Sequence, residues 1–365
     1  ANTGLTWTDA LPTLQDALLL YDACPEKVDE IWVAEGIYYP DRGGYFGDPS
    51  TTPLADRRDR SFQLTNDGTG GVKIYGGFAG TENSTGERGD PASNVTVLSG
   101  DIQQNDVTNA AGILLDPGGI VGTNSNHVLL ENDPTCAPSG PTDCPLIDRF
   151  SVTGGDAWTG GVDGSTAAEQ GGGMWSLNGV TTLSEVRFQG NQAIRGGGLH
   201  LGNISENLLI RVEFENNWAR DGGGMAVVDE SSANLDTVTF RGNKAMAKGS
   251  GSPILGNGGG AYISSASSTP THFLGVYFYD NVADDHGGGI FIDRHPSGSH
   301  LVVMENVTFE GNKATGNGTA SGIGGAMATR NNNPQVDLGW FRGHEAVSGG
   351  AIANLAGAQS IFFDS

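Results

Sequence analysis

One cluster of acidic side chains comprises Asp280, Asp284 and Asp285, and His286 follows directly. Carboxylate oxygens are ligands that Ca²⁺ prefers, so these three aspartates are a candidate metal site. Their spacing does not match a calcium loop of the D-x-D-x-D-G kind, and aspartate in a turn also bonds the main chain of the turn itself. We therefore expect no required cofactor and keep Ca²⁺ as a candidate ligand.

Four large side chains recur two positions after a glycine triplet: Trp175, His200, Tyr262 and Phe291. If the segments that carry them lie side by side, they form an exposed strip that could stack on sugar rings or on another protein. The alternative is that the long loops 245–257 and 313–323 fold over the strip and bury it. The sequence leaves both interpretations open.

Residues in a catalytic arrangement are harder to find. A polysaccharide lyase needs a base next to a cation, and a glycoside hydrolase needs paired carboxylates. Arg187 and Glu213 occupy equivalent positions in neighbouring repeats, but a surface salt bridge explains this pair better. The sequence has no G-x-S-x-G motif and no zinc-like histidine spacing, and residues 284–287 only partly resemble a galacturonase signature. We predict no catalytic residue and favour a protein without enzymatic activity.

The elements that must position these side chains come from a repeat over residues 171–365. One phrase is a glycine pair or triplet and a short apolar strand, which begins at Met174, Leu199, Met225, Ala261, Ile290, Met327 and Ile352. The other phrase is apolar-x-Phe-x-x-Asn, with asparagines at Asn191, Asn217, Asn243, Asn281 and Asn312 and a degenerate copy that ends at His344. Its six phenylalanines, from Phe188 to Phe341, are 26, 26, 38, 31 and 32 residues apart. This period is typical of solenoid coils whose loops absorb insertions.

We predict an all-β fold, a right-handed parallel β-helix (solenoid) with a short N-terminal capping helix. A period of two turns the apolar columns inward, and handedness follows the general rule for parallel crossovers. The phenylalanines should stack ring on ring. The five asparagines should form a structural ladder from coil to coil at a turn, because asparagine tolerates left-handed backbone angles. The glycine triplets suit corners at which a Cβ would clash.

The pairing of F-x-x-N with G-G-[AGLIV] resembles the repeat of the polymorphic outer membrane proteins and related bacterial surface β-helix proteins, over residues 171–365. The runs 31–40 and 74–80 are similar to upstream parts of such proteins. The resemblance implies an extracellular or cell-surface protein, an adhesin or structural component. Its partners would be other copies of itself, or a cell-surface protein or polysaccharide. The alternative is a polysaccharide lyase or glycoside hydrolase, because many parallel β-helices are such enzymes.

Residues 1–170 are predicted to form the N-terminal cap helix and irregular early coils, and residues 171–365 the regular coils of the same β-helix. Thr13 offers a capping-box-like start before an apolar stripe of Leu14, Ala17, Leu18 and Tyr21. Strand-like runs lie at 31–39, 72–78, 95–99 and 126–130. Residues 361–363 begin a further copy of the repeat. We therefore expect a truncation there, a covering domain, or an interface that builds head-to-tail filaments.

The charge balance of the chain limits its partners. Its net charge of −23 argues against nucleic acid, because phosphate binding needs clustered Lys and Arg. No apolar run approaches the roughly 20 residues of a membrane span, so we expect no membrane insertion by these residues. The chain starts at Ala1, as an exported protein does after removal of its signal peptide. Cys136 and Cys144 are predicted to form a local disulfide, with two free thiols as the alternative.

Overall fold

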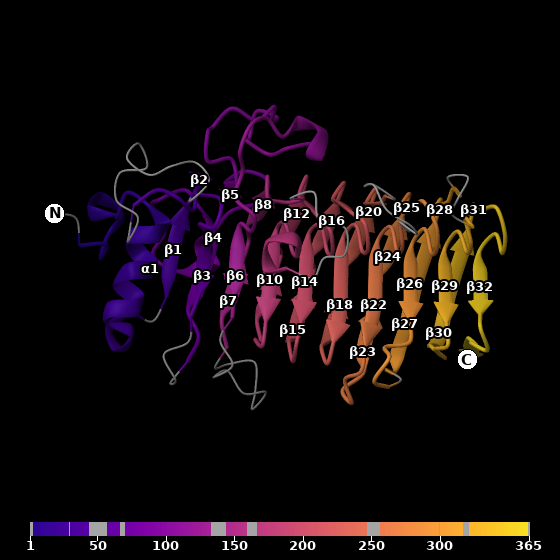
Figure 1. Cartoon of the computed structure of the whole chain (residues 1–365). Helices are drawn as coiled ribbons and strands as arrows, with labels where there is room; N and C mark the ends of the chain where they lie inside the picture. The colour runs from indigo at the N-terminus through magenta and orange to yellow at the C-terminus, as the bar shows by residue number, and fades with distance from the viewer. Residues whose placement is uncertain are drawn as a thin grey trace.

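Each coil contributes strands that pair in parallel with those of the next coil, so the coils form a stack with the termini at opposite ends (Figure 1). The structure is a computed structural model, and it describes residues 3–28, 30–43, 57–65, 70–132, 144–158, 166–246, 256–298, 300–316 and 321–363. Its strands form three sheets, which we call sheets I, II and III. The predicted parallel β-helix is confirmed.

Sheet I supplies two strands to most coils. Its strands are β1 (Ile31–Ala34), β2 (Gly36–Tyr38), β4 (Lys73–Phe78), β5 (Thr96–Ser99), β7 (Leu146–Asp148), β8 (Ser151–Thr153), β11 (Thr182–Ser184), β12 (Arg187–Gln189), β15 (Glu206–Ile210), β16 (Glu213–Glu215), β19 (Ser232–Asp236), β20 (Thr239–Arg241), β23 (Thr271–Leu274), β24 (Tyr277–Tyr279), β27 (Val302–Glu310), β30 (Gln335–Arg342) and β33 (Ile361–Phe363).

Sheets II and III supply one strand each. Sheet II consists of β3 (Phe62–Leu64), β6 (Leu129–Glu131), β10 (Met174–Leu177), β14 (Leu199–Gly202), β18 (Met225–Asp229), β22 (Ala261–Ser265), β26 (Ile290–Asp293), β29 (Met327–Arg330) and β32 (Ile352–Leu355). Sheet III consists of β9 (Asp156–Ala157), β13 (Gln192–Ala193), β17 (Trp218–Ala219), β21 (Lys244–Ala245), β25 (Val282–Ala283), β28 (Lys313–Ala314) and β31 (Glu345–Ala346).

The strands predicted upstream of the repeat are present as β1 and β2, β4, β5 and β6. They belong to the same stack as the regular coils, because β6 pairs with β10 and places Leu129 beside Met174. Strands on both sides of residue 170 therefore belong to one stack, and the division into irregular and regular coils stays a prediction.

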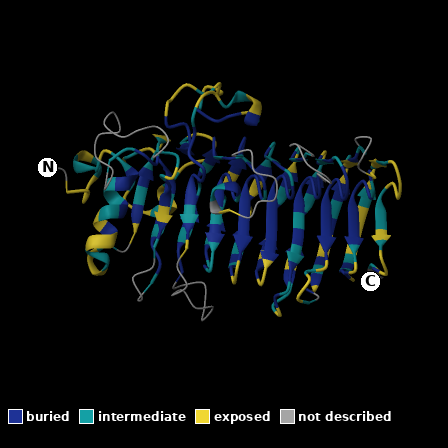
Figure 2. Ribbon diagram, in the orientation of Figure 1, coloured by how far each residue is buried: buried dark blue, intermediate teal, exposed yellow. Residues whose placement is uncertain are grey.

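Phenylalanine rings fill the core as predicted. Consecutive rings from Phe188 to Phe341 lie 4.6 to 5.2 Å apart between centroids, with interplanar angles of 4° to 8°. All but the last of these phenylalanines are completely buried. Figure 2 shows the buried interior as dark blue along most of the stack, whereas β32 at the C-terminal end is teal. Offset stacking of this kind adds to the free energy gained from burying apolar area.

The predicted asparagine ladder is confirmed. Each side-chain Nδ2 donates to the side-chain Oδ1 of the next ladder residue at 2.9–3.0 Å, from Asn191 through to Asn312. Their assignment to a left-handed turn is wrong. The residue before each ladder position has the positive φ instead, as at Asn216 (51°) and Asp280 (53°). The asparagines are thus selected for hydrogen bonding, and the preceding glycine, asparagine or aspartate for the corner.

Each of the three positions of a triplet requires glycine for a different structural reason. Gly222 has φ +69°, in the left-handed region that favours glycine. A Cβ on Gly223 would lie 2.4 Å from the Gly259 carbonyl oxygen of the next coil. A Cβ on Gly224 would lie 2.9 Å from Cδ1 of Phe240. The triplet therefore turns the chain, lets coils approach, and makes room for the phenylalanine stack.

Sheet III adds a column of small residues that the sequence analysis missed. Each of its strands carries one alanine, and all but the last of these are buried: Ala157, Ala193, Ala219, Ala245, Ala283, Ala314 and Ala346. The signal was present, because six of the seven alanines lie two positions after the asparagine, or its histidine substitute, in a longer pattern F-x-x-N-x-A. A small side chain suits this narrow corner of the coil, which lies between the ladder and the glycines.

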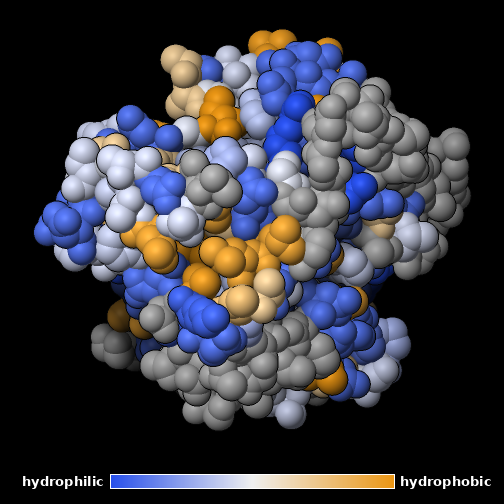
Figure 3. Space-filling view, turned by 90° about the vertical axis from the view of Figure 1, so that its left-hand side faces the viewer, coloured by the Kyte–Doolittle hydropathy of each residue, from blue (hydrophilic) through white to orange (hydrophobic). Residues whose placement is uncertain are grey.

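The predicted N-terminal cap is α1 (Leu14–Ala23), whose first turn is capped by Thr13 Oγ1 accepting from the Asp16 N–H at 3.1 Å. Leu14, Leu18 and Tyr21 are buried against the first coils, as the apolar stripe predicted. Figure 3 looks onto this end, where an orange apolar area is bordered by hydrophilic residues. The helix covers core residues of the first coils that strand pairing alone would leave open.

Candidate functional site

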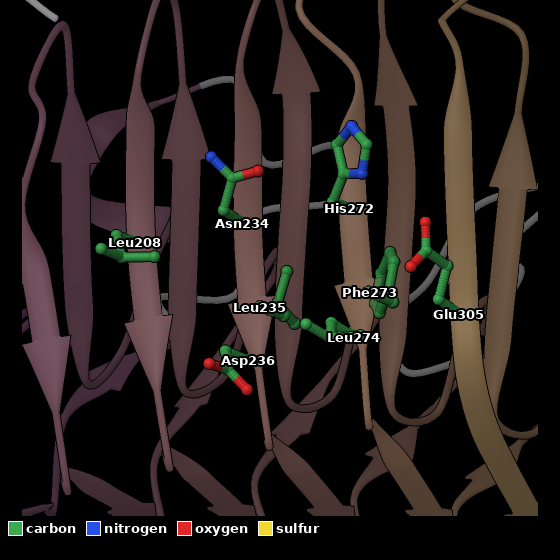
Figure 4. A pocket seen from close by; sticks show the side chains of 8 residues that line it. All are labelled: Leu208, Asn234, Leu235, Asp236, His272, Phe273, Leu274 and Glu305. Atoms are coloured by element: carbon green, nitrogen blue, oxygen red, sulfur yellow. The ribbon is translucent and has the colours of Figure 1, made fainter.

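A shallow groove of about 280 Å³ lies on the outer face of sheet I (Figure 4). It crosses four strands that are consecutive in the stack, β15, β19, β23 and β27. Its lining consists of Leu208, Asn234, Leu235, Asp236, His272, Phe273, Leu274 and Glu305. All eight lie outside the F-x-x-N and glycine phrases.

Strand register arranges the outward side chains of the groove in two rows. In the first row, Leu208 pairs with Asn234, and Asn234 pairs with His272. The residues between the rows, Leu235 and Phe273, are buried in the core. Since successive strand residues face opposite sides, both flanking rows must face solvent.

The second row carries the negative charge of the groove. Asp236 pairs with Leu274, which pairs with Glu305. The two acidic residues are therefore two strand spacings apart, about 10 Å between their main chains. Asp236 Oδ1 accepts from Thr237 Oγ1 at 2.8 Å, and Leu274 between the two acids is 49% exposed. No Lys or Arg is among the lining residues, so the groove attracts cations and repels anions.

These groups have a consistent chemistry. Asn234 and His272 can exchange hydrogen bonds with hydroxyl groups, and the methyl groups of Leu208 and Leu274 offer apolar contact. The two rows run along the axis of the stack, and strand pairing continues the first row from Leu208 to Thr182 and from His272 to Val303.

Aromatic side chains lie on the other half of sheet I, beyond the corner that Gly275 makes with its positive φ. The Tyr277 and Tyr279 rings stack at 5.9 Å and 10°, and the Arg241 guanidinium lies 4.9 Å from the Tyr279 ring centroid. Tyr277 shares a row with Thr308 and Trp340, and Trp340 is 70% exposed. Stacking on sugar rings is a common use of such exposed aromatic faces.

The sequence analysis did not single out the groove, although a signal for its floor exists. In each coil an apolar residue lies five positions before the repeated phenylalanine, as do Leu235 and Phe273. Recognising this apolar column would have predicted that the residues on either side of it in each strand face outward. Their identities vary from coil to coil, so no repeat pattern points to them.

The predicted strip of Trp175, His200, Tyr262 and Phe291 does form one continuous row of sheet II, with Ala226 between His200 and Tyr262. Of the two interpretations that the sequence left open, exposure and burial, the structure shows burial. His200 and Phe291 are each only 1% exposed, and Trp175 and Tyr262 are half-buried. Strand alternation turns the row away from the core, but it does not decide whether other segments cover it.

Contacts within the described residues show how enclosed the row is. The His127 ring packs 5.3 Å from Trp175, and the His286 ring packs 5.1 Å from Phe291. The Arg330 guanidinium lies 5.4 Å from the same Phe291 ring. Burial raises the pKa of Tyr262 to about 12. The row is therefore not an open platform for sugars.

The three candidate metal-binding aspartates have separate structural surroundings. Asp280 forms an exposed corner with positive φ. Asp285 is completely buried, and its Oδ1 accepts from the N–H and the hydroxyl of Ser321 at 2.7 and 2.9 Å. In the part of the chain that the structure describes, no three His, Cys, Asp or Glu side chains are grouped to hold a metal. Calcium binding by Asp280, Asp284 and Asp285 stays a prediction.

A polar network next to Asp285 crosses three coils. Nδ1 of His286 lies 2.6 Å from Asp285 Oδ2 and 3.0 Å from Asn257 Oδ1. Asn257 Nδ2 donates to Asp221 Oδ1 at 3.0 Å, and Asp221 pairs with Arg220 at 2.7 Å. These residues precede the glycine triplets, so the network ties the corners of neighbouring coils together.

Two further predictions concern single pairs. Arg187 and Glu213 form an ion pair of 2.6 Å with both side chains about half exposed, which confirms a surface salt bridge. Cys144 is disulfide-bonded and Cys24 is a free thiol. Cys136 lies outside the described residues, so its pairing with Cys144 stays a prediction.

None of the helices among the described residues has the length and apolar character of a membrane span. Comparison of the chain with protein-family models, with curated proteins and with solved structures finds no match in any of the three.

Proposed function

We propose that this protein is an extracellular or cell-surface binding protein that holds an extended polysaccharide along the outer face of sheet I. The observation that carries the proposal is the open groove across β15, β19, β23 and β27. It combines apolar side chains with hydrogen-bonding groups, and exposed aromatic residues lie on the same sheet. The disulfide at Cys144 supports an oxidising, exported setting.

The charge of the groove selects among polysaccharides. Asp236 and Glu305 face the ligand without a cation among the lining residues. A uronic acid polymer would bring carboxylates against carboxylates, which costs binding free energy. The preferred ligand is therefore a neutral or amino-sugar polymer.

A binding experiment with the full chain tests the proposal. Immobilised neutral, amino-sugar and uronic acid polysaccharides are compared, and we expect retention on the first two classes alone. His272→Ala should weaken retention at least several-fold, because His272 lines the groove. His295→Ala is the matched control, since His295 lies in a turn outside the groove. The proposal is overturned if the two variants are retained equally, or if the wild-type protein is not retained on any of the polysaccharides.

A second candidate function is hydrolysis of the bound chain. Asp236 and Glu305 line one groove two strand spacings apart, and inverting glycoside hydrolases place their two carboxyl groups about 6.5–9.5 Å apart. Release of reducing ends from a bound polysaccharide, abolished in both Asp236→Asn and Glu305→Gln, would establish an enzyme. Binding without product leaves the protein a binding protein.

A further inference from the structure

The second row of the groove places an apolar side chain between two carboxylates along the axis of the stack. Asp236 pairs with Leu274, and Leu274 pairs with Glu305, so each of three successive coils supplies one residue of the row. Figure 4 shows the three residues in a line that crosses the strands. The two carboxylates therefore lie two coils apart, with an exposed leucine at the coil between them.

Both carboxylates are available to a ligand. Asp236 and Glu305 are exposed, and in the part of the chain that the structure describes no ion pair involves either of them. In Figure 4 the two carboxylates point to opposite sides of the row. Because exposed side chains change rotamer within nanoseconds, both can turn toward a ligand that lies over Leu274.

The spacing of this row matches one class of polysaccharide. Adjacent strands lie about 4.8 Å apart, and one sugar of an extended β-1,4-linked chain has a similar length. Successive sugars of such a chain are turned over relative to each other, so a given substituent faces the same side only at every second sugar. A chain that runs along the stack would therefore bring equivalent substituents to Asp236 and Glu305.

The charge of the row selects the substituent. A protonated amino group complements a carboxylate, and the net charge of −23 attracts polycations from a distance. No Lys or Arg lines the groove, so no cation of the lining competes with the amino groups of a ligand. A neutral chain would still form hydrogen bonds with the groove, but it would leave both carboxylates without a cationic partner.

We propose that the ligand of this groove is a β-1,4-linked amino-sugar chain whose amino groups on alternate sugars pair with Asp236 and Glu305. The inference rests on the proposed function, and it narrows the ligand to one linkage and one substituent. Leu274 would contact the ring hydrogens of the sugar between the two amines. An exposed ion pair changes affinity by about two- to fivefold, so the selectivity comes from pairing at both ends of the row.

Two isomeric trisaccharides test the spacing. Both are β-1,4-linked, and each carries two free amino groups and one acetylated amino group. The free amines are on the two terminal sugars of the first isomer and on adjacent sugars of the second. Charge and composition are identical, so calorimetric titration of the full chain reports the position of the amines alone. We expect the first isomer to bind about two- to fivefold more tightly, and equal affinities or the reverse order overturn the proposal.

Variants of the two carboxylates test their roles. Asp236→Asn and Glu305→Gln should each remove the preference between the isomers, and each should weaken retention on an immobilised β-1,4-linked glucosamine polymer about two- to fivefold. Glu230→Gln is the matched control, because Glu230 is exposed directly after β18 and is not among the groove residues. An equal loss in the control would show attraction by overall charge alone and overturns the proposal.

A neutral polymer separates this inference from the proposed function. If a neutral β-1,4-linked glucan is retained, and retention of the glucosamine polymer does not respond to Asp236→Asn or Glu305→Gln, the inference is overturned and the proposed function stands. If no polysaccharide is retained, both are overturned. High salt should weaken retention of the glucosamine polymer more than that of the neutral glucan, because exposed ion pairs are screened.

Discussion

Asn217 Nδ2 donates a hydrogen bond to Asn243 Oδ1 at 3.0 Å, and the main-chain N–H of Asn217 donates to the same oxygen at 3.0 Å. The Asn217 amide donates its second hydrogen to the Phe188 carbonyl oxygen of the preceding coil at 2.8 Å. One side chain therefore links three successive coils. Both asparagines are completely buried, so every one of these bonds is made away from competing water.

Removing one ladder amide should destabilise the whole stack. Asn243→Ala leaves the two Asn217 donors and the Phe214 carbonyl oxygen without their partner. At about 1–3 kcal/mol for each unsatisfied buried group, we expect a loss of at least about 3 kcal/mol in the free energy of unfolding. Denaturant titration measures it. Asn234→Ala, which truncates an exposed asparagine, should change stability by less than about 0.5 kcal/mol, and similar losses in the two variants would contradict the ladder's role.

The histidine that replaces the sixth ladder asparagine offers the opposite test. His344 Nδ1 accepts from the Asn312 N–H at a longer 3.2 Å, and His344 Nε2 is buried without a partner. His344→Asn would extend the ladder by one residue and remove that unpaired atom. We expect a gain of about 1 kcal/mol in the free energy of unfolding, measured by denaturant titration. A loss would show that the histidine ring is needed at this end of the stack.

The third glycine of the triplet should reject a methyl group where the coil is tightly packed. In Gly224→Ala the new Cβ would lie 2.7 Å from the Gly260 carbonyl oxygen and 2.9 Å from Phe240 Cδ1. Overpacking of this kind typically costs about 1–3 kcal/mol, and thermal unfolding would report it as a lower midpoint. The natural Ala326 occupies the same position in a later triplet, so Ala326→Gly should cost less, about 0.5–1 kcal/mol from the greater freedom of the unfolded chain. The reverse order of costs would refute this account of the triplet.

Much of the interior could be predicted from the sequence because its positions repeat. Met174, Leu199 and Met225 share a column, and equal spacing from a glycine triplet is enough to place them there. The same logic placed the phenylalanines and the ladder asparagines. The repeat did not predict which residue takes the left-handed conformation. The positive φ lies at Asn216, one residue before the recurring asparagine, Asn217.

The outer faces could not be predicted in the same way. Alternation turned His200 and Phe291 outward as expected, yet both are buried, because covering depends on contacts from residues such as His286 that belong to no strand. The groove residues Asn234 and His272 are outward by the same alternation and remain exposed. Strand periodicity decides the direction of a side chain, but only the three-dimensional course of the remaining segments decides whether it meets solvent.

Buried histidines should make the fold sensitive to mild acid. Burial, with smaller contributions from Arg195 and His127, lowers the pKa of His200 to about 3, and burial likewise lowers the pKa of His127 to about 4. An unfolded histidine titrates near pH 6.5. Below pH 6.5 the unfolded chain therefore takes up protons that the folded chain does not. The free energy of unfolding consequently decreases as the pH is lowered, by up to about 1.4 kcal/mol per pH unit for each histidine.

The variant His200→Gln isolates this effect. Its free energy of unfolding should fall less than that of the wild-type protein between pH 7 and pH 5, a range chosen because most carboxylates remain ionised across it. The pKa of Asp106 is raised to about 6, so protonation of Asp106 stabilises the folded protein as the pH is lowered, which is the opposite effect. Because Asp106 is present in both proteins, it does not affect their comparison. His272→Gln is the matched control, because it makes the same exchange of residue types at an exposed position on the groove. Parallel curves for the wild-type protein and His200→Gln would show that His200 takes up its proton without unfolding.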